Sequence, residues 1–206
     1  GIPLAWGTAT ALVGRLFPRW TRPCRLLKLE INRVPDQLRT LVVMPVLLSS
    51  PRRAEEICDQ IEALSCLEQD ENIQYLILGD FADGDAPHAS GDVEILERTR
   101  QRVREINARA GRERCFYLHR ERQLLEADRR WMGRDRKRGA LSDLNRLLLG
   151  QPGAETAFDA EGAACRSLRG KFRFVLTIDA DTRFLPGEAR RLIGTLAHPL
   201  NAPRRV

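Results

Sequence analysis

The stretch LRTLVVMPVLLSSP, residues 38–51, decides how this chain folds. From Leu38 to Leu48 the residues are mostly apolar and several are β-branched, which is typical of a strand buried on both faces of a parallel sheet. Two serines and a proline then end the strand and open a helix, because a hydroxyl caps the first turn and proline suits the first helical position. Glu55 and Glu56 follow near the positive end of that helix. The stretch therefore predicts a strand followed directly by a helix.

The same alternation continues along the chain. We expect a second buried strand at IQYLILGDF (73–81), a third, short strand at CFYLHR (115–120) and a fourth strand at FRFVLTIDADT (172–182), with a long helix over residues 92–110. Strands that alternate with helices indicate an α/β fold with an open, mostly parallel sheet. Ligands of such sheets bind at the carboxyl ends of the strands.

Two more segments complete this outline. LSDLNRLLLG, residues 141–150, predicts a helix that Gly150 ends. The Gly- and Ala-rich residues 151–170 predict a flexible stretch, and residues 1–37 an irregular lead-in. Within that lead-in, the uncharged residues 1–14 are shorter than the roughly 20 that a membrane-spanning helix needs. They suit either a packed amphipathic lead-in or a tail that emerges from membrane-embedded sequence.

The amino-acid composition limits the chemical class of the binding partner but does not identify the partner. The net charge of +6, mostly from arginine, suits an anionic partner: a nucleotide diphosphate, a nucleic acid or an acidic membrane surface. Five cysteines without a CxxC pair argue against a disulfide framework and a zinc site, and indicate a reducing compartment. The three histidines are scattered, and we expect packing or surface roles for them.

The strongest chemical signal is the pair Asp179 and Asp181, which ends the last predicted strand. Two carboxylates one residue apart can turn toward one hard cation, and Mg²⁺ or Mn²⁺ favours such oxygen ligands. The cation would neutralise a leaving nucleoside diphosphate. The same pair also suits a plain exit from a strand into a turn, or a helix cap.

Two weaker signals accompany this acidic pair. Lys137, Arg138 and Gly139 precede a helix that contains Asn145, and basic side chains beside a glycine at a helix start can hold phosphates. The alternative is a solvated basic helix entry. Asp80, at the end of the second strand, can accept the imide N–H of uracil or cap the next turn. We take these five residues as candidate substrate-binding residues.

Together these segments resemble a known family. VVMPVLLSS, YLILGDF, WMGRDRKRGALSDLNRLLLG and LTIDADTRFLPGEARRLIGTLAHPLN, taken in order, are similar to the glycosyltransferase region of cyclic β-1,2-glucan synthases, which are large bacterial inner-membrane proteins. More broadly, the strand, the KxG element and the DxD pair resemble processive A-type glycosyltransferases such as cellulose synthase. The resemblance covers most of the chain from about residue 38.

This resemblance implies a Rossmann-like A-type fold and the transfer of glucose from UDP-glucose to a growing β-1,2-glucan with inversion, using Mg²⁺ or Mn²⁺. By carry-over, Asp179 and Asp181 bind the metal and diphosphate, Lys137 contacts phosphate, and Asp80 contacts the uridine. Residues 38–206 are then the nucleotide-sugar-binding part of a catalytic domain truncated at its C-terminus. The general base is expected beyond Val206, so we expect the isolated chain to be inactive.

The resemblance also implies a place in the cell, namely the cytoplasmic face of the bacterial inner membrane. There the chain would be joined to the remainder of a larger membrane-associated synthase.

Two alternatives belong to other classes. A basic nucleic-acid-binding module would use arginines of residues 92–110 and 134–138, but glutamates interleave with them and no aromatic stacking platform is present. We therefore expect no nucleic acid partner. An inactive structural domain would keep the fold without the chemistry, and the intact acidic pair argues against it.

Overall fold

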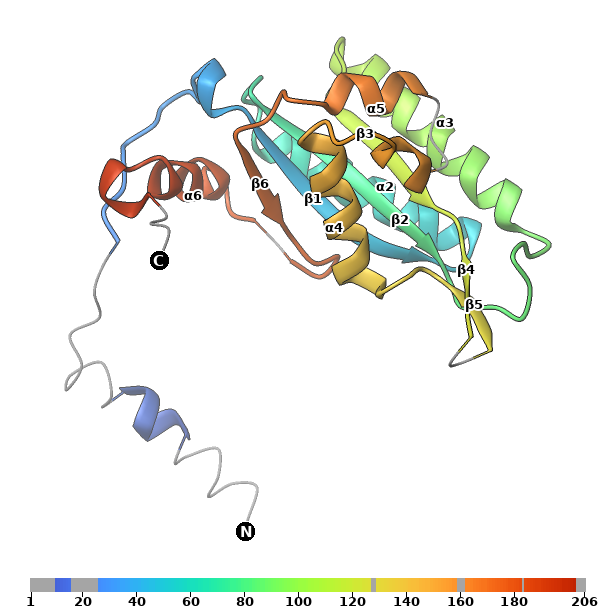
Figure 1. Ribbon diagram of the computed structural model, residues 1–206. Helices are drawn as coiled ribbons and strands as arrows, with labels where there is room; N and C mark the ends of the chain where they lie inside the picture. Colours follow the sequence, from blue (N-terminus) through green and yellow to red (C-terminus); the bar gives the residue numbers. More distant parts are fainter. Residues whose placement is uncertain (1–9, 16–25, 127–128, 159–161, 183, 203–206) are drawn as a thin grey trace.

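The computed structural model describes residues 10–15, 26–126, 129–158, 162–182 and 184–202. At its centre lies a four-stranded sheet in the order β3-β2-β1-β6, in which all neighbouring strands run parallel (Figure 1). The strands are β1 (Thr40–Leu48), β2 (Ile73–Phe81), β3 (Cys115–Arg120) and β6 (Phe174–Thr177). The prediction of a Rossmann-like open α/β sheet is confirmed.

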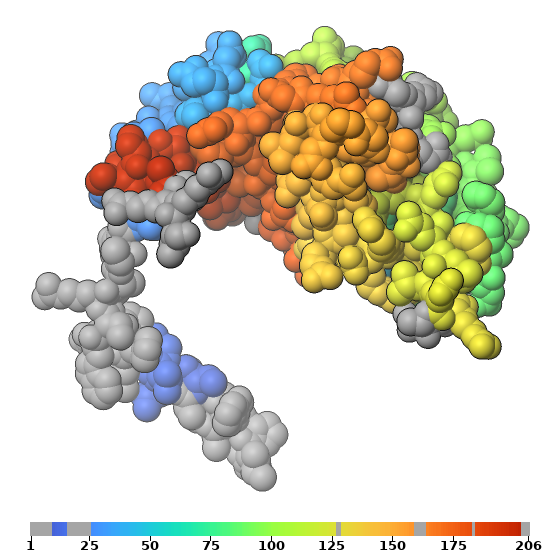
Figure 2. All heavy atoms as spheres, in the orientation of Figure 1, coloured from blue at the N-terminus to red at the C-terminus, as the bar shows by residue number. Residues whose placement is uncertain are grey.

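Helices cover both faces of this sheet. They are α2 (Pro51–Leu67), α3 (Asp92–Ala110), α4 (Arg136–Leu148), α5 (Gly162–Leu168) and α6 (Glu188–Leu196), with short 3-10 turns η1 (Asp36–Leu38), η2 (Ala154–Ala157) and η3 (Pro199–Asn201). A small antiparallel hairpin, β4 (Gln123–Leu125) and β5 (Arg130–Met132), stands beside the sheet. Figure 2 shows α4 and α5 together on one face.

The start of α2 forms as its sequence predicts. Ser50 caps the helix, because its hydroxyl accepts a hydrogen bond from the backbone N–H of Arg53 at 3.1 Å. Pro51 occupies the first turn, where its missing N–H costs nothing. The helix therefore begins directly after β1, which fixes the carboxyl end of that strand.

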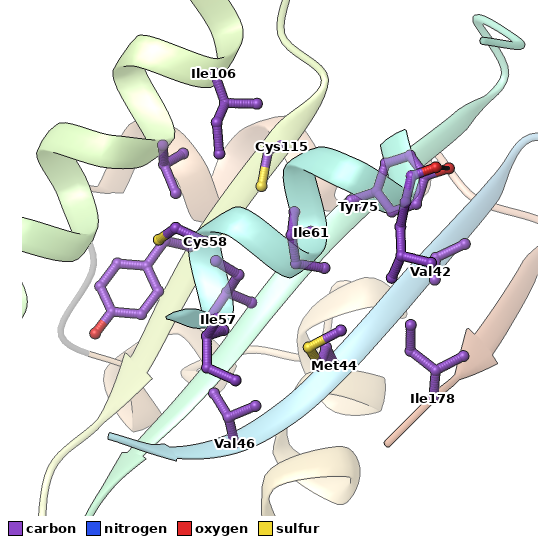
Figure 3. Packing of buried hydrophobic residues seen from close by; sticks show 14 of the residues in the cluster. Val42, Met44, Val46, Ile57, Cys58, Ile61, Tyr75, Ile106, Cys115 and Ile178 are labelled. Carbon is purple, nitrogen blue, oxygen red and sulfur yellow. Dashed lines mark hydrogen bonds between the residues drawn. The ribbon is translucent and has the colours of Figure 1, made fainter. Parts of the chain in front are cut away.

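The strand β1 divides the core into two layers by simple alternation. Val42, Met44 and Val46 point toward the side of α2, where they meet Ile57 and Ile61 (Figure 3). The residues between them on the strand face α4 and α5 instead. Each fully buried side chain of this size contributes roughly 1.5–3 kcal/mol by leaving water. A strand buried on both faces is therefore what the uninterrupted apolar run encodes.

The last strand is shorter than predicted. Residues 172–182 were expected to be extended, yet β6 ends at Thr177 and one further bond joins the backbone N–H of Ile178 to the carbonyl of Val43. A turn follows at once, in which the N–H of Thr182 donates to the carbonyl of Asp179 at 2.9 Å. The prediction was wrong in length because the turn begins at the first aspartate.

Two other boundaries also differ. The helix expected at 141–150 begins earlier, at Arg136, because the charged residues before it project outward and do not interrupt its apolar face. Residues 151–170, predicted to be flexible, contain η2 and α5, and Cys165 and Leu168 pack against the sheet. A few apolar residues that pack against the sheet are enough to hold such short elements in place.

The described part of the lead-in is attached to the other end of the chain. The N–H of Leu29 donates to the carbonyl of Gly194 in α6 at 3.0 Å, and a Cβ on Gly194 would lie only 2.3 Å from the Leu29 carbonyl oxygen. Asn201 donates to the carbonyl of Leu27 at 2.7 Å. Residues 1–9 and 16–25 of the predicted lead-in lie outside the described residues. Of the helices described, none has the length and apolarity to cross a bilayer.

The imidazole of His119 is enclosed in the core. It is fully buried beside the ring of Phe81, its Nδ1 lies 2.8 Å from the Tyr117 hydroxyl, and its Nε2 has no hydrogen-bond partner among the described residues. Burial, helped by nearby arginines and opposed by Asp92, lowers the pKa of His119 from 6.5 to about 3. The packing role predicted for this histidine agrees with that environment.

We expect acid to destabilise the protein through His119. Between pH 6.5 and 3 the unfolded chain binds a proton that the folded state excludes, so stability falls as the pH drops below about 6.5. From pH 7 to pH 5 this loss is about 2 kcal/mol. Urea denaturation at both pH values should show it for the native chain and not for His119→Gln. Equal pH dependence of the two proteins would contradict the assignment.

Candidate functional site

A pocket of about 470 Å³ opens at the carboxyl ends of β1 and β2, where the α/β fold places its ligands. Its apolar part comes from the end of β1, including Val46 and Leu47. Three basic side chains, Arg53, Arg136 and Lys137, form its rim, and the buried Asp80 lies among its lining residues. The apolar floor and cationic rim suit a ligand that joins an aromatic or sugar ring to an anionic group.

Asp80 is held by an ion pair with Arg120 at the end of the neighbouring strand. The Arg120 Nε donates to Asp80 Oδ1 at 2.8 Å and its Nη2 to Asp80 Oδ2 at 2.6 Å. Both side chains are more than nine-tenths buried, and their positions are paired in the parallel register of β2 and β3. Two parallel N–H···O bonds fix the carboxylate plane as well as its position.

The same guanidinium also ties α4 to the sheet. Its Nη1 donates to Asp143 Oδ2 at 3.1 Å and to the carbonyl of Arg134 at 3.0 Å, and its Nη2 donates to the carbonyl of Arg136 at 2.9 Å. Although burial lowers the pKa of Arg120, the bonds to its two carboxylates raise it above its ordinary value. Arg120 therefore stays charged and positions the turn that carries Lys137.

Two glycines make this turn possible. A Cβ on Gly133 would lie 2.5 Å from Asp80 Oδ2, and a Cβ on Gly139 would lie 2.0 Å from the carbonyl oxygen of Arg134. Both distances are well below the contact distance of a carbon and an oxygen atom. Gly139, which was predicted to help hold phosphate, thus has a packing role. Its lack of a side chain lets the turn at Arg134 approach the first turn of α4 closely.

The acidic pair, Asp179 and Asp181, follows β6, and both residues are exposed. Neither aspartate lines the pocket, but Ala180 between them does. The ammonium of Lys137 contacts Asp179 Oδ1, so the two strongest predicted elements meet in space. Among the described residues no group of three or more His, Cys, Asp or Glu side chains gathers as a metal site. Two carboxylates with open positions suit Mg²⁺ or Mn²⁺, which keep water and substrate phosphate as further ligands.

Of the predicted substrate-binding residues, only Asp80 and Lys137 line the pocket. Arg138 is exposed and lies 3.5 Å from Asp135, and Asn145 is exposed further along α4. Neither belongs to the residues that line the pocket. Nothing in this arrangement tests their predicted roles, and they stay predictions.

Sequence reasoning missed Arg120, Asp143 and Arg53. One signal was present for Arg120, because it ends a predicted strand just as Asp80 does, and parallel strand ends meet at one edge of the sheet. Asp143 gave no such signal, because an aspartate within a predicted helix is usually solvated.

The parallel sheet, the pocket at its strand ends and the acidic pair after its last strand define an α/β domain with a Rossmann-like open sheet. Over 199 residues, which make up 95% of it, the chain is 34% identical to cyclic beta-(1,2)-glucan synthase NdvB of Rhizobium meliloti (strain 1021). This similarity confirms the resemblance to the cyclic β-1,2-glucan synthases. The chain spans about 7% of the length of that curated relative. No family model matches the chain.

Removing Arg120 should strongly destabilise the protein. Arg120→Met leaves the buried Asp80 without its cation and Asp143 with Arg134 alone, and removing one partner of a buried pair costs about 3–5 kcal/mol. Arg102→Met is the matched control, because Arg102 also pairs with three carboxylates, Asp59, Glu62 and Glu105, but at the surface. Urea denaturation should show a much smaller loss for the control. Similar losses of unfolding free energy for both variants would mean that the buried ion pair stabilises the protein no more than the surface ion pairs do.

Gly139→Ala should also destabilise, because the added methyl group collides with the Arg134 carbonyl and must displace the turn. We expect a loss of about 1–3 kcal/mol in thermal denaturation experiments. Gly91→Ala adds the same methyl group where no atom lies within 4 Å and should change little. A tolerated alanine at position 139 would argue against the tight approach.

Proposed function

We propose that this chain supplies the nucleotide-sugar donor site of a glycosyltransferase that transfers glucose from UDP-glucose to a growing β-1,2-glucan with inversion. The contact of Lys137 with Asp179 carries the proposal, because it joins the predicted phosphate-binding element, whose lysine lines the pocket, to the predicted metal-binding pair. The printed name of the relative, cyclic beta-(1,2)-glucan synthase, supports the acceptor and the linkage.

In this proposal each side chain has a distinct task. The pocket floor takes the uracil ring, with Asp80 directed toward its imide by the bidentate bond to Arg120. The ammonium of Lys137 pairs with a phosphate oxygen. Asp179 and Asp181 would hold Mg²⁺ or Mn²⁺, which supplies charge neutralisation to the leaving diphosphate.

The reaction itself forms one bond and breaks one. The acceptor hydroxyl oxygen attacks the anomeric carbon from the face opposite the diphosphate, the bond to the diphosphate oxygen breaks, and UDP departs. The hydroxyl proton passes to a general base. We assign no residue of this chain to that base, and we propose that the chain alone binds donor without transferring glucose.

We further propose that the site works at the cytoplasmic face of the bacterial inner membrane, as part of a larger synthase. A nucleic-acid-binding function has no support from the arrangement of the arginines on α3. Arg98, Arg102 and Arg109 are each paired with carboxylates of α2 or α3. The charges of these arginines are therefore neutralised by carboxylates of the protein itself.

Calorimetric titration of UDP in the presence of Mn²⁺ tests the donor site. The native chain should bind, and binding should disappear when the metal is chelated. Asp179→Asn and Asp181→Asn should each weaken it by roughly tenfold or more, since even an outer-shell change at a metal site costs that much. Asp85→Asn, an exposed carboxylate in the loop after β2, is the matched control. Absence of metal-dependent UDP binding by a folded native sample would reject the proposal.

A further inference from the structure

Lys137 and Asp179 contact each other although the proposed function gives them different ligands. Lys137 lies in the first turn of α4 and Asp179 directly after β6, and the Nζ atom of the lysine meets Oδ1 of the aspartate. The proposed function sends the ammonium to phosphate and the carboxylate to a divalent cation. Both assignments require this contact to open.

We propose that Lys137 occupies the cation position at Asp179 until the donor arrives, and then exchanges partners. The ammonium leaves the carboxylate for the diphosphate, and the divalent cation takes its place beside Asp179. This inference rests on the proposed function and concerns how the same site is regulated. It makes the metal and the nucleotide bind as one coupled event.

Lys137 is well suited to such an exchange. Its side chain is 47% exposed and that of Asp179 is 64% exposed, so neither is locked in place by packing. The neighbouring Arg136 is held at 2.8 Å by Asp83 in the loop after β2. Lysine also carries its charge on a flexible four-carbon stem, which can turn between two anionic partners.

Charge gives the exchange its direction. The ammonium of Lys137 neutralises Asp179, so a divalent cation that arrives alone must displace it before it can bind the carboxylate. A nucleotide diphosphate brings negative charge that draws Lys137 away and attracts the cation at the same time. By linkage, each ligand must then raise the affinity for the other.

The test measures Mn²⁺ alone, without nucleotide, by the electron paramagnetic resonance signal of the free ion. Lys137→Met should bind Mn²⁺ roughly two- to fivefold more tightly than the native chain, the range expected for breaking an exposed ion pair. The same variant should bind UDP with Mn²⁺ more weakly than the native chain. Opposite effects on the two ligands are the signature of the exchange.

Two controls isolate the contact. Lys137→Arg keeps the charge at this position and should keep the native Mn²⁺ affinity. Arg146→Met removes one positive charge from the exposed surface of the same helix, near Gln151 and outside the pocket, and should leave Mn²⁺ binding unchanged.

The inference is overturned if Lys137→Met binds Mn²⁺ no more tightly than the native chain, or if neither protein binds Mn²⁺ alone. It is also overturned if Arg146→Met gives the same gain, because the effect would then reflect overall charge. Failure of the proposed function looks different, since the native chain would then not bind UDP even at saturating Mn²⁺.

Discussion

The buried guanidinium of Arg120 is the interaction on which the pocket depends. It binds one carboxylate from β2, another from α4 and two carbonyl groups of the turn between the hairpin and α4. Carboxylates are costly to bury unless they are paired, and Arg120 is the cation that pairs with Asp80, while Asp143 pairs with both Arg120 and Arg134. Buried contacts with the sheet, rather than solvent-exposed contacts, therefore fix the position of the turn that carries Lys137.

Much of the fold was predictable because burial on two faces leaves a plain pattern. The runs that became β1, β2 and β3 are apolar almost without interruption, and Ser50 marks the start of the helix that follows β1. The hairpin β4–β5 and the short α5 were missed, because three-residue strands and a seven-residue helix contain too few residues to show a period. The early end of β6 was missed because apolar residues continue to Ile178.

The candidate site was predictable to the extent that it lies at strand ends. Asp80 and the acidic pair follow buried strands, and parallel topology brings them to one edge. The contact between Lys137 and Asp179 could not be read from the sequence, because it depends on how α4 crosses the sheet. The donor sugar and the linkage could not be predicted from individual residues at all. They rest on the resemblance to a synthase of which this chain covers a small part.

The order of the strands has a consequence for how the molecule is made. β1 pairs with β2 soon after both emerge from the ribosome, but its other edge must wait for β6, where Thr40 meets Phe174. Until then the central strand has one side without a hydrogen-bonding neighbour, an edge that invites pairing with other chains. Vectorial synthesis therefore delivers Ala180, between the two aspartates, as the last of the residues that line the pocket.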